Sequence, residues 1–449
     1  MIGELNPGEI SSAKKKVEEF LSNYGMNYSE IDIQKHVDLF VQEMQEGLSG
    51  KKSSLRMFPT YIGFKRVIPS NEPVIVLDAG GTNLRSALLH FDNKNKPVIT
   101  NFSKTDMPGI EREASKAEFF RAIAENVKGI LGNSQRIGFV FSYPIEIYPD
   151  RDGRLVRFTK EIKASEVEGE FIGKNLIDVI KRYEKSSSSK HFVILNDTVA
   201  TLLSGISAFS ERNYGSYIGF VFGTGMNACY IEKNSNIQKA KGKGLDPDDY
   251  QLINIEAGNF SRGPRGKIDE AFDKKTLNPG IYNFEKMFSG AYFGGLALEV
   301  LKYSAYSGIF SDRLSLEIKK LSGLESRDVS DFLYYPPANE PMLRLNENMS
   351  ESDRIKAYYL LDSLEERAAI LTTIVLVASI LKSGSGRNPL RPVCIVAEGS
   401  SYYKMKNFQS KVCGYMGKVL SERGNYYFEI NRVENAVMLG AAVAALTCQ

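Results

Sequence analysis

Tryptophan is absent from this sequence, and cysteine and histidine are scarce. Four cysteines and three histidines occur among 449 residues, at Cys229, Cys394, Cys413, Cys448, His36, His90 and His191. The cysteines form no C-x-x-C pair, which argues against a zinc site or a disulfide framework. The histidines have no partners at ligand spacing, so we interpret them as structural or solvated. Catalysis by a serine–histidine or cysteine–histidine pair is therefore poorly supported.

The chain also lacks an excess of charge of one sign and a long apolar run. Its formal net charge is +3, so no strong field favours nucleic acid. The longest apolar stretch, residues 368–381, is interrupted by hydroxyl side chains and is too short to span a bilayer, so it predicts a buried helix. Residues 1–7 do not resemble a secretory signal, and free cysteines fit a reducing compartment. We expect a cytoplasmic protein without a membrane or nucleic-acid partner.

Two glycine–threonine turns stand between apolar β runs, after a helical pattern over residues 7–50. Residues 73–78 form an apolar run that ends in Asp78, residues 79–83 form the turn, and residues 84–91 resume the strand. The same order recurs at residues 216–222, 223–227 and 228–232. A dinucleotide-binding fold would enter a helix after the glycine turn, whereas these glycines close hairpins. The recurrence predicts a duplicated unit with backbone N–H groups at each turn.

The intervening and following segments predict an α/β layering. Helices are expected at residues 116–131 and 172–183, and strands at 137–142, 192–195 and 393–397. A helix over residues 434–446 closes the chain. Residues 311–351 are charged and are expected to be irregular. The length favours two or three domains.

Asp197 follows an apolar strand in the segment Asn196-Asp197-Thr198. An unpaired carboxylate is costly to bury, so structure alone is a weak reason for it. Capping of the helix that begins near Val199 explains the residue as well as catalysis does. Taken alone, Asp197 leaves the two interpretations open.

Phosphoryl transfer requires donors for phosphate oxygens, an acid to hold magnesium and a base for the accepting hydroxyl. The two hairpins supply donors, Asp78 is placed to hold Mg²⁺ through water, and Arg85 is placed to neutralise phosphate charge. Polar side chains within apolar surroundings recur along the chain, as a hexose site requires, although each alone is explained as well by a cap or turn. They are Ser142, Thr159, Lys160, Asn227, Glu256 and Glu285.

From about residue 53 to the C-terminus the sequence resembles the hexokinases, within the actin-like ATPase superfamily. The resemblance rests on motifs in family order, at residues 55–61, 77–85, 138–144, 158–160, 195–199, 221–230, 253–258, 284–290 and 396–400. It implies that the sugar is contacted by Ser142, Thr159, Lys160, Asn196, Asp197, Asn227, Glu256 and Glu285. It implies that the nucleotide is held by Asp78, Gly80, Gly81, Thr82, Asn83, Arg85, Thr224, Gly399 and Ser400. Asp197 would take the proton from the 6-hydroxyl, with Lys160 balancing local charge.

The resemblance also implies the architecture and the partners. We expect a two-domain α/β protein of the actin-like ATPase (ribonuclease H-like) fold with a central cleft. Residues 58–197 would form a small domain rejoined by 433–449, residues 198–432 a large domain, and residues 1–57 a helical segment packed on it. ATP and Mg²⁺ are the expected cofactors, a hexose such as glucose is the expected substrate, and the protein would be a monomer or homodimer.

Several positions depart from the family pattern. Glu398 stands in place of an aspartate, Ala257 in place of a tryptophan, and Tyr282 where many members have a sugar-contacting glutamine. Residues 433–436 replace a terminal nucleotide segment rich in glycine and serine. Two rival functions remain at this stage, a catalytically silent hexose sensor and an actin- or chaperone-like ATPase. The polar residues typical of a hexose site argue against the actin- or chaperone-like ATPase.

Overall fold

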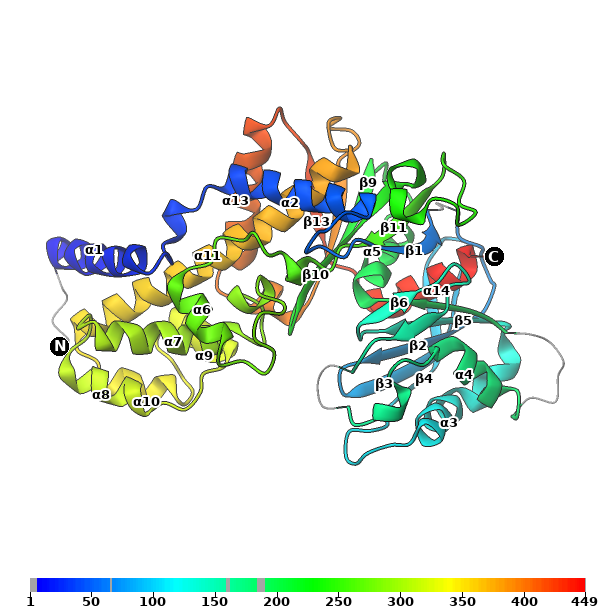
Figure 1. Cartoon of the computed structure of the whole chain (residues 1–449), viewed down its shortest axis with the longest axis horizontal. Helices are drawn as coiled ribbons and strands as arrows, with labels where there is room; N and C mark the ends of the chain where they lie inside the picture. Colours follow the sequence, from blue (N-terminus) through cyan, green and yellow to red (C-terminus); the bar gives the residue numbers. More distant parts are fainter. Residues whose placement is uncertain (1–5, 65–66, 159–161, 184–189, 449) are drawn as a thin grey trace.

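A computed structural model describes residues 6–64, 67–158, 162–183 and 190–448. The chain begins with the helices α1 (Pro7–Asn23) and α2 (Ile33–Ser49), as the sequence predicts. The Asn6 side chain accepts from the Glu9 N–H, and the Glu9 carboxylate accepts from the Asn6 N–H, which closes a capping box at the start of α1. Gly50 ends α2 in the left-handed conformation. Figure 1 shows both helices on the outside of the part of the molecule that contains α11.

A five-stranded sheet contains the first hairpin. Its order is β4-β3-β2-β5-β8, and its strands are β2 (Val74–Gly80), β3 (Asn83–Phe91), β4 (Pro97–Asp106), β5 (Arg136–Phe141) and β8 (His191–Leu195). β2 pairs antiparallel with β3 and parallel with β5, which pairs parallel with β8. A small hairpin of β6 (Ile145–Ile147) and β7 (Gly153–Leu155) lies beside this sheet.

The second sheet repeats this arrangement. Its order is β1-β11-β10-β9-β12-β13, and its strands are β1 (Phe58–Gly63), β9 (Ser216–Phe222), β10 (Met226–Lys233), β11 (Tyr250–Asn254), β12 (Val393–Glu398) and β13 (Phe428–Asn431). As in the first sheet, an antiparallel hairpin is followed by two parallel strands. The duplicated unit predicted from the glycine turns is thus confirmed. β1 pairs with β11, so the expected small-domain start at Phe58 falls in the second sheet, and the first sheet starts only at Val74.

Two helices lie between the sheets. α14 (Ala436–Thr447) packs against β2, β5 and β8, while α5 (Asp197–Ala208) packs against β9, β10 and β12, and the two helices contact each other. A Cβ at Gly440 would lie 1.9 Å from the carbonyl oxygen of Ala200, so only glycine permits this close crossing. Val74 and Val76 of β2 join the core that contains α5 and α14.

The opposite face of the first sheet is covered by α3 (Lys116–Val127) and α4 (Ile172–Ile180). Ile75 and Leu77 face this layer, because successive side chains of a strand point to opposite faces. β2 is therefore buried on both sides, as its continuous apolar sequence predicts.

The remaining helices gather around α11 on the other side of the molecule (Figure 1). They are α6 (Lys267–Asp273), α7 (Phe293–Tyr306), α8 (Asp312–Lys320), α9 (Ser326–Tyr334), α10 (Met342–Glu347), α11 (Glu351–Ser383), α12 (Ser400–Lys404) and α13 (Phe408–Glu422). The expectation that residues 311–351 are irregular is wrong, since α8, α9 and α10 occupy most of this segment. Leu314 and Ile318 bury one face of α8, while charged side chains occupy its other face. The sequence of this segment is therefore mostly polar, and its helical periodicity is hard to detect.

The predicted buried helix at residues 368–381 lies within α11. Among the residues that the structure describes, no helix is long and apolar enough to cross a membrane. The same residues contain no group of three or more histidine, cysteine or acidic side chains arranged to hold a metal ion.

Candidate active site

The first hairpin places a buried carboxylate beside its glycine turn. Gly80 pairs with Asn83 across the hairpin, and Asp78 lies opposite Arg85. The Asp78 carboxylate is buried, and the Arg85 Nη1 contacts its Oδ2 at 3.2 Å while the Arg85 side chain is 45% exposed. The structure therefore brings the predicted magnesium acid and the predicted phosphate-neutralising arginine together.

Ser142 lies at the same end of the sheet, because β5 runs parallel to β2. Its N–H donates to the Ala79 carbonyl, and its hydroxyl lies 3.7 Å from the place of a Cβ at Gly80. The sequence analysis assigned Ser142 to the sugar, and the structure places it beside the first hairpin.

Tyr143 supports this turn and was missed by the sequence analysis. Its hydroxyl donates to the Gly81 carbonyl at 2.7 Å, and this hydrogen bond holds the turn in place. Burial raises the pKa of Tyr143, and the nearby Asp78 charge raises it further, so the phenol stays protonated and remains a donor. An isolated tyrosine after a strand carries no local signal for such a role.

The second hairpin is tied to Glu285. The Met226 N–H donates to the Glu285 Oε2 at 2.8 Å, and Gly225 approaches the same carboxylate closely. Thr224 is exposed at the turn. The carbonyls of Gly223 and Thr224 accept from the N–H groups of residues 290 and 291, which fixes the hairpin to the segment that carries Glu285.

A chain of side-chain hydrogen bonds joins Asn227 to Glu256. The Asn227 amide donates to Asn254 Oδ1 at 2.7 Å, and the Asn254 amide donates to Glu256 Oε1 at 2.8 Å. The Asn227 oxygen accepts from the N–H groups of Ala228 and Ala257, so its orientation is set. Asn254 is a buried polar residue that the sequence analysis left outside the predicted site, although its place at a strand end is the same signal that identified Asp197.

The structure shows that Asp197 does not cap the helix that follows it. Asn196 is the N-cap of α5, since its side-chain oxygen accepts from the Thr198 N–H at 2.9 Å. Asp197 is the first helical residue, and its Oδ1 accepts from the Thr198 hydroxyl at 3.1 Å. The helix is capped without the Asp197 carboxylate, which leaves that group half-buried at the end of β8 and without a capping role.

Asp197 and Glu256 share one electrostatic environment, although they follow strands of different sheets. Burial raises the pKa of the Glu256 carboxyl, and the negative charge of Asp197 raises it further. A carboxyl group whose pKa is raised by burial and by a neighbouring carboxylate is typical of functional sites. Thr159 and Lys160, which the sequence analysis also assigned to this site, lie outside the described residues.

The predicted adenosine segment lies against the second hairpin. Gly399 has φ +114°, and a Cβ there would lie 2.2 Å from the Phe222 carbonyl oxygen, so the approach requires glycine. Thr224 and Ser400 line one cavity of about 450 Å³ together with residues of α7, α9 and α12. The carboxyl of Glu398 is partly buried, which raises its pKa, while Arg432 opposes this shift.

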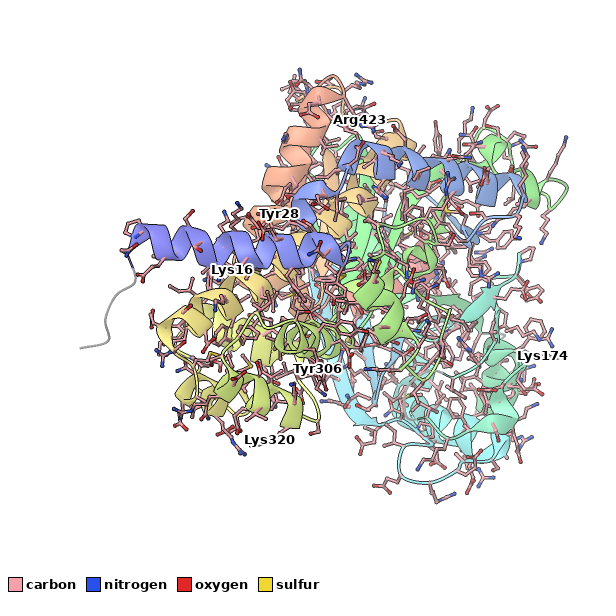
Figure 2. All side chains as sticks on the ribbon, turned by 60° about the vertical axis from the view of Figure 1, so that its left-hand side comes forward. Lys16, Tyr28, Lys174, Tyr306, Lys320 and Arg423 are labelled. Carbon is pink, nitrogen blue, oxygen red and sulfur yellow. The ribbon has the colours of Figure 1, made fainter. Side chains whose placement is uncertain are left out.

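A larger cavity, of about 670 Å³, lies apart from these groups, at the N-terminus of α4 and the start of β8. The Asp152 carboxylate already accepts the N–H groups of Gly153, Gly173 and Lys174 there. Lys174 projects outward from this edge (Figure 2). Because its most buried acid is satisfied by the chain itself, this cavity does not belong to the candidate site.

Proteins of one family are similar to this chain over most of its length. Two family models, each described as hexokinase, match residues 16–207 and 217–447. Hexokinase-1 of Schizosaccharomyces pombe is 30% identical over 440 residues, which cover 91% of this chain and 86% of that protein. Hexokinase-7 of Oryza sativa subsp. japonica is 28% identical over 426 residues, 90% of each chain. Hexokinase-2 of Rattus norvegicus is 28% identical over 91% of this chain but only 45% of its own length.

Among solved structures, a hexokinase from Schistosoma mansoni complexed with glucose is similar over 98% of this chain and 100% of that one. Its TM-score is 0.79 and its sequence identity is 25%. The fold expected from the sequence, that of the actin-like ATPases, is thereby confirmed.

Proposed function

The chain belongs to the hexokinase family and is a hexose phosphotransferase, and we propose that it transfers the γ-phosphoryl group of ATP to the 6-hydroxyl of glucose with Asp197 as the general base. The assignment of Asp197 as the base rests on the observation that its carboxylate does not cap α5. Asn196 caps α5, while Asp197 lies close enough to Glu256 to raise the pKa of that carboxyl. A carboxylate in this position is available to accept a proton from a bound hydroxyl.

The polar chain of the second sheet supports a site for the sugar. Asn227, Asn254 and Glu256 are held by hydrogen bonds to one another and to the backbone, so their remaining donors and acceptors point in set directions. Sites built in this way discriminate strongly against ligands that lack the matching hydroxyl. We assign these residues and Glu285 to the hexose hydroxyls, together with Ser142, Asn196, Thr159 and Lys160.

The two hairpins support a site for the nucleotide. Backbone N–H groups of Gly80, Gly81 and Thr82, with Asn83, Arg85 and Thr224, would hold the phosphates, and Gly399 and Ser400 would adjoin the adenosine. The residues present fit Mg-ATP, because Asp78 is a buried carboxylate facing the first turn and Thr224 shares a cavity with Ser400. Asp78 would hold Mg²⁺ through water. Mg²⁺, when bound, neutralises charge on the transferred phosphoryl group.

In the proposed reaction the sugar oxygen attacks the γ-phosphorus as its proton moves to Asp197. A bond forms between that oxygen and phosphorus, the bond to the bridging oxygen of ADP breaks, and ADP leaves with the electron pair. Arg85 and the turn N–H groups stabilise the charge on the phosphoryl oxygens. Lys160, as in the family, would balance charge beside the base. We further propose that the protein acts in the cytoplasm, which its free thiols support.

The test is hexose-dependent ADP release, measured with glucose, mannose, fructose, glucosamine and N-acetylglucosamine, with identification of the phosphorylated carbon by NMR. We expect glucose 6-phosphate as the product. Glucose binding without any ADP release would refute phosphorylation, and phosphate on another carbon would refute the assignment of the 6-hydroxyl.

A further inference from the structure

Arg157 is held in a defined position on the part of the molecule that contains the first sheet. It follows β7, whose Leu155 is buried in the core formed with α3 and α4. The N–H of Val156 donates to the Pro144 carbonyl at 2.9 Å, and the N–H of Phe158 donates to the Glu168 carboxylate at 2.8 Å. Both neighbours of Arg157 are thus anchored, and its guanidinium extends from a fixed stretch of backbone.

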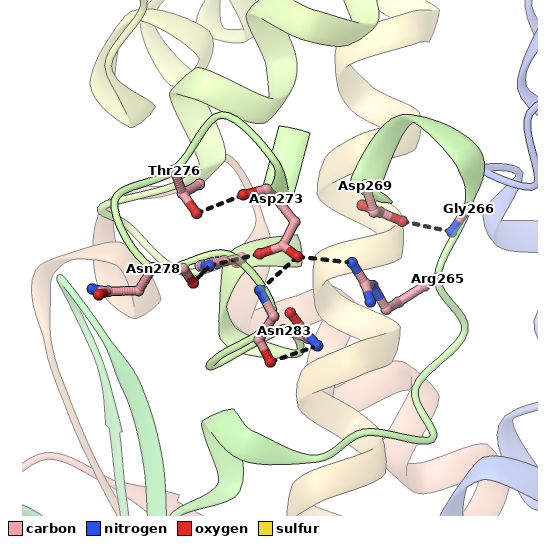
Figure 3. A network of polar contacts seen from close by, with 9 residues as sticks. Arg265, Gly266, Asp269, Asp273, Thr276, Asn278 and Asn283 are labelled. Carbon is pink, nitrogen blue, oxygen red and sulfur yellow. Dashed lines mark hydrogen bonds and ion pairs between the residues drawn. The ribbon is translucent and has the colours of Figure 1, made fainter. Parts of the chain in front are cut away.

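Tyr282 belongs to the other part of the molecule, in the loop between α6 and the segment that carries Glu285. Figure 3 shows the polar network that holds this loop. The Asp273 carboxylate accepts from Lys286 Nζ at 2.6 Å and from the Gly280 N–H at 2.9 Å, and Lys286 also donates to the Asn278 carbonyl. Asp273 and Lys286 are 7% and 3% exposed, so the pair is shielded from solvent.

The network also determines the charge state of the loop. Burial opposes ionisation of Asp273, but the hydrogen bonds from Lys286 and Gly280 outweigh it and hold the pKa of Asp273 below its ordinary value. The ion pair is therefore present at neutral pH. It fixes both ends of the loop that presents Tyr282.

Tyr282 meets Arg157 across the two parts of the molecule. The Arg157 guanidinium carbon lies 5.9 Å from the centre of the Tyr282 ring, within the range of a cation–π contact. Tyr282 has a backbone φ of +55°, which residues other than glycine and asparagine seldom adopt. The loop therefore imposes this backbone conformation and with it the direction of the tyrosine side chain. The Lys286 N–H donates to the Tyr282 carbonyl, and Tyr282 stands three residues before Glu285 of the proposed sugar site.

We propose that Arg157 and Tyr282 form a latch at the rim of the hexose pocket, which slows release of the bound sugar and keeps water from the phosphoryl group. The inference rests on the proposed function. The latch joins the two parts of the molecule beside the pocket, so the arrangement that closes around the sugar is favoured by the strength of this contact. A partly exposed cation–π pair corresponds to roughly 2- to 30-fold in the affinity for the hexose.

The latch also affects which acceptor reaches the γ-phosphorus. If the rim opens, water attacks in place of the sugar, the bond to the ADP oxygen breaks, and inorganic phosphate and ADP are released. The useful probe is 6-deoxyglucose, a hexose that lacks the accepting hydroxyl. With it bound, ADP release reports water alone.

The experiment compares Arg157→Gln, Tyr282→Leu, their double variant and Tyr282→Phe with the wild-type chain. The control is Arg387→Gln, because Arg387 lies 4.2 Å from the Tyr426 ring in a pair that stays within one part of the molecule. Glucose dissociation constants are measured by calorimetry without ATP. Phosphorylation with saturating glucose and ADP release with 6-deoxyglucose are measured separately.

We expect Arg157→Gln and Tyr282→Leu each to weaken glucose binding 2- to 30-fold and to raise ADP release with 6-deoxyglucose. The double variant should weaken glucose binding no more than the stronger of these two single variants. Tyr282→Phe retains the ring and should bind as the wild type does, and kcat with saturating glucose should change less than about threefold. Additive effects, unchanged single variants, or an equal effect of Arg387→Gln would overturn the latch. Failure of the wild-type chain to phosphorylate glucose would instead refute the proposed function, while the binding data would still decide on the latch.

Discussion

Replacing Asp197 by asparagine separates the catalytic role of this residue from its contribution to folding. The asparagine side chain has nearly the same shape, and its amide oxygen accepts the Thr198 hydroxyl as the carboxylate does. The cap of α5 is untouched, because Asn196 makes it. Only the negative charge and the capacity to take a proton are lost.

The two effects differ in size. Loss of a general base lowers the rate by about 10²–10⁴, equivalent to roughly 3–5 kcal/mol of barrier. Loss of an acidic charge in the first turn of a helix costs about 0.3–1 kcal/mol of stability. Removal of the repulsion between Asp197 and Glu256 offsets part of this cost. We therefore expect a folded protein with glucose affinity within a few-fold of wild type and almost no turnover.

The assay combines coupled ADP release, calorimetric glucose binding and thermal unfolding on the same preparation. Asp312→Asn is the matched control, since Asp312 is also the first residue of a helix, α8, whose cap is the side chain of the preceding Ser311. It should lose a similar amount of stability and no activity. Asp197→Asn with turnover within tenfold of wild type would refute the base assignment. Loss of turnover together with loss of the fold would show a structural role instead.

Three further predictions concern stability and the nucleotide. Burial raises the pKa of Glu365 to about 8, so the folded state holds a proton that the unfolded state releases from about pH 4.5 upward, and stability falls across this window. Glu365→Gln removes this loss of stability, so it should raise the unfolding temperature at pH 8 by the equivalent of roughly 3–5 kcal/mol and leave it unchanged at pH 4.5. An equal effect at the two pH values would contradict the raised pKa of Glu365 as the cause. Gly399→Ala adds a methyl group that collides with β9 and should raise the KM for ATP at least about tenfold with glucose binding unchanged, which kinetics and calorimetry can test. Gly440→Ala should lower stability by about 3 kcal/mol or more in thermal unfolding, whereas Gly414→Ala, with open space around it in α13, should be neutral or stabilising.

Much of the fold was predictable because its signals are local. The two hairpins, the strands that follow them and the helix within residues 368–381 depend on apolar periodicity and on glycine, which act over a few neighbouring residues. The prediction of an irregular segment at residues 311–351 failed for the same reason. The helices there are short, and each buries only a narrow face against the rest of the helical core.

The site was predictable in part. Polar residues at the ends of apolar strands identified Asp78, Asp197 and Glu256, and the resemblance to the hexokinases added their roles. Asn254 and Tyr143 were missed, because their contributions depend on partners in other strands. The pairing of β1 with β11 and the contact of Arg157 with Tyr282 join residues that are far apart in the chain, and no local pattern indicates them.

The sequence by itself thus determined the α/β layering, the duplicated hairpins and the candidate base, because period, glycine and strand-end polarity are properties of short segments. Taken alone, Asp197 was equally explained as a helix cap, and the accompanying motifs and the resemblance to the hexokinases favoured the base. Only the tertiary structure decided that question, since the cap is made by Asn196 and the perturbed neighbour, Glu256, comes from another sheet. Which groups share one electrostatic environment depends on how separate strands are brought together in space, and short-range preferences carry no information about it.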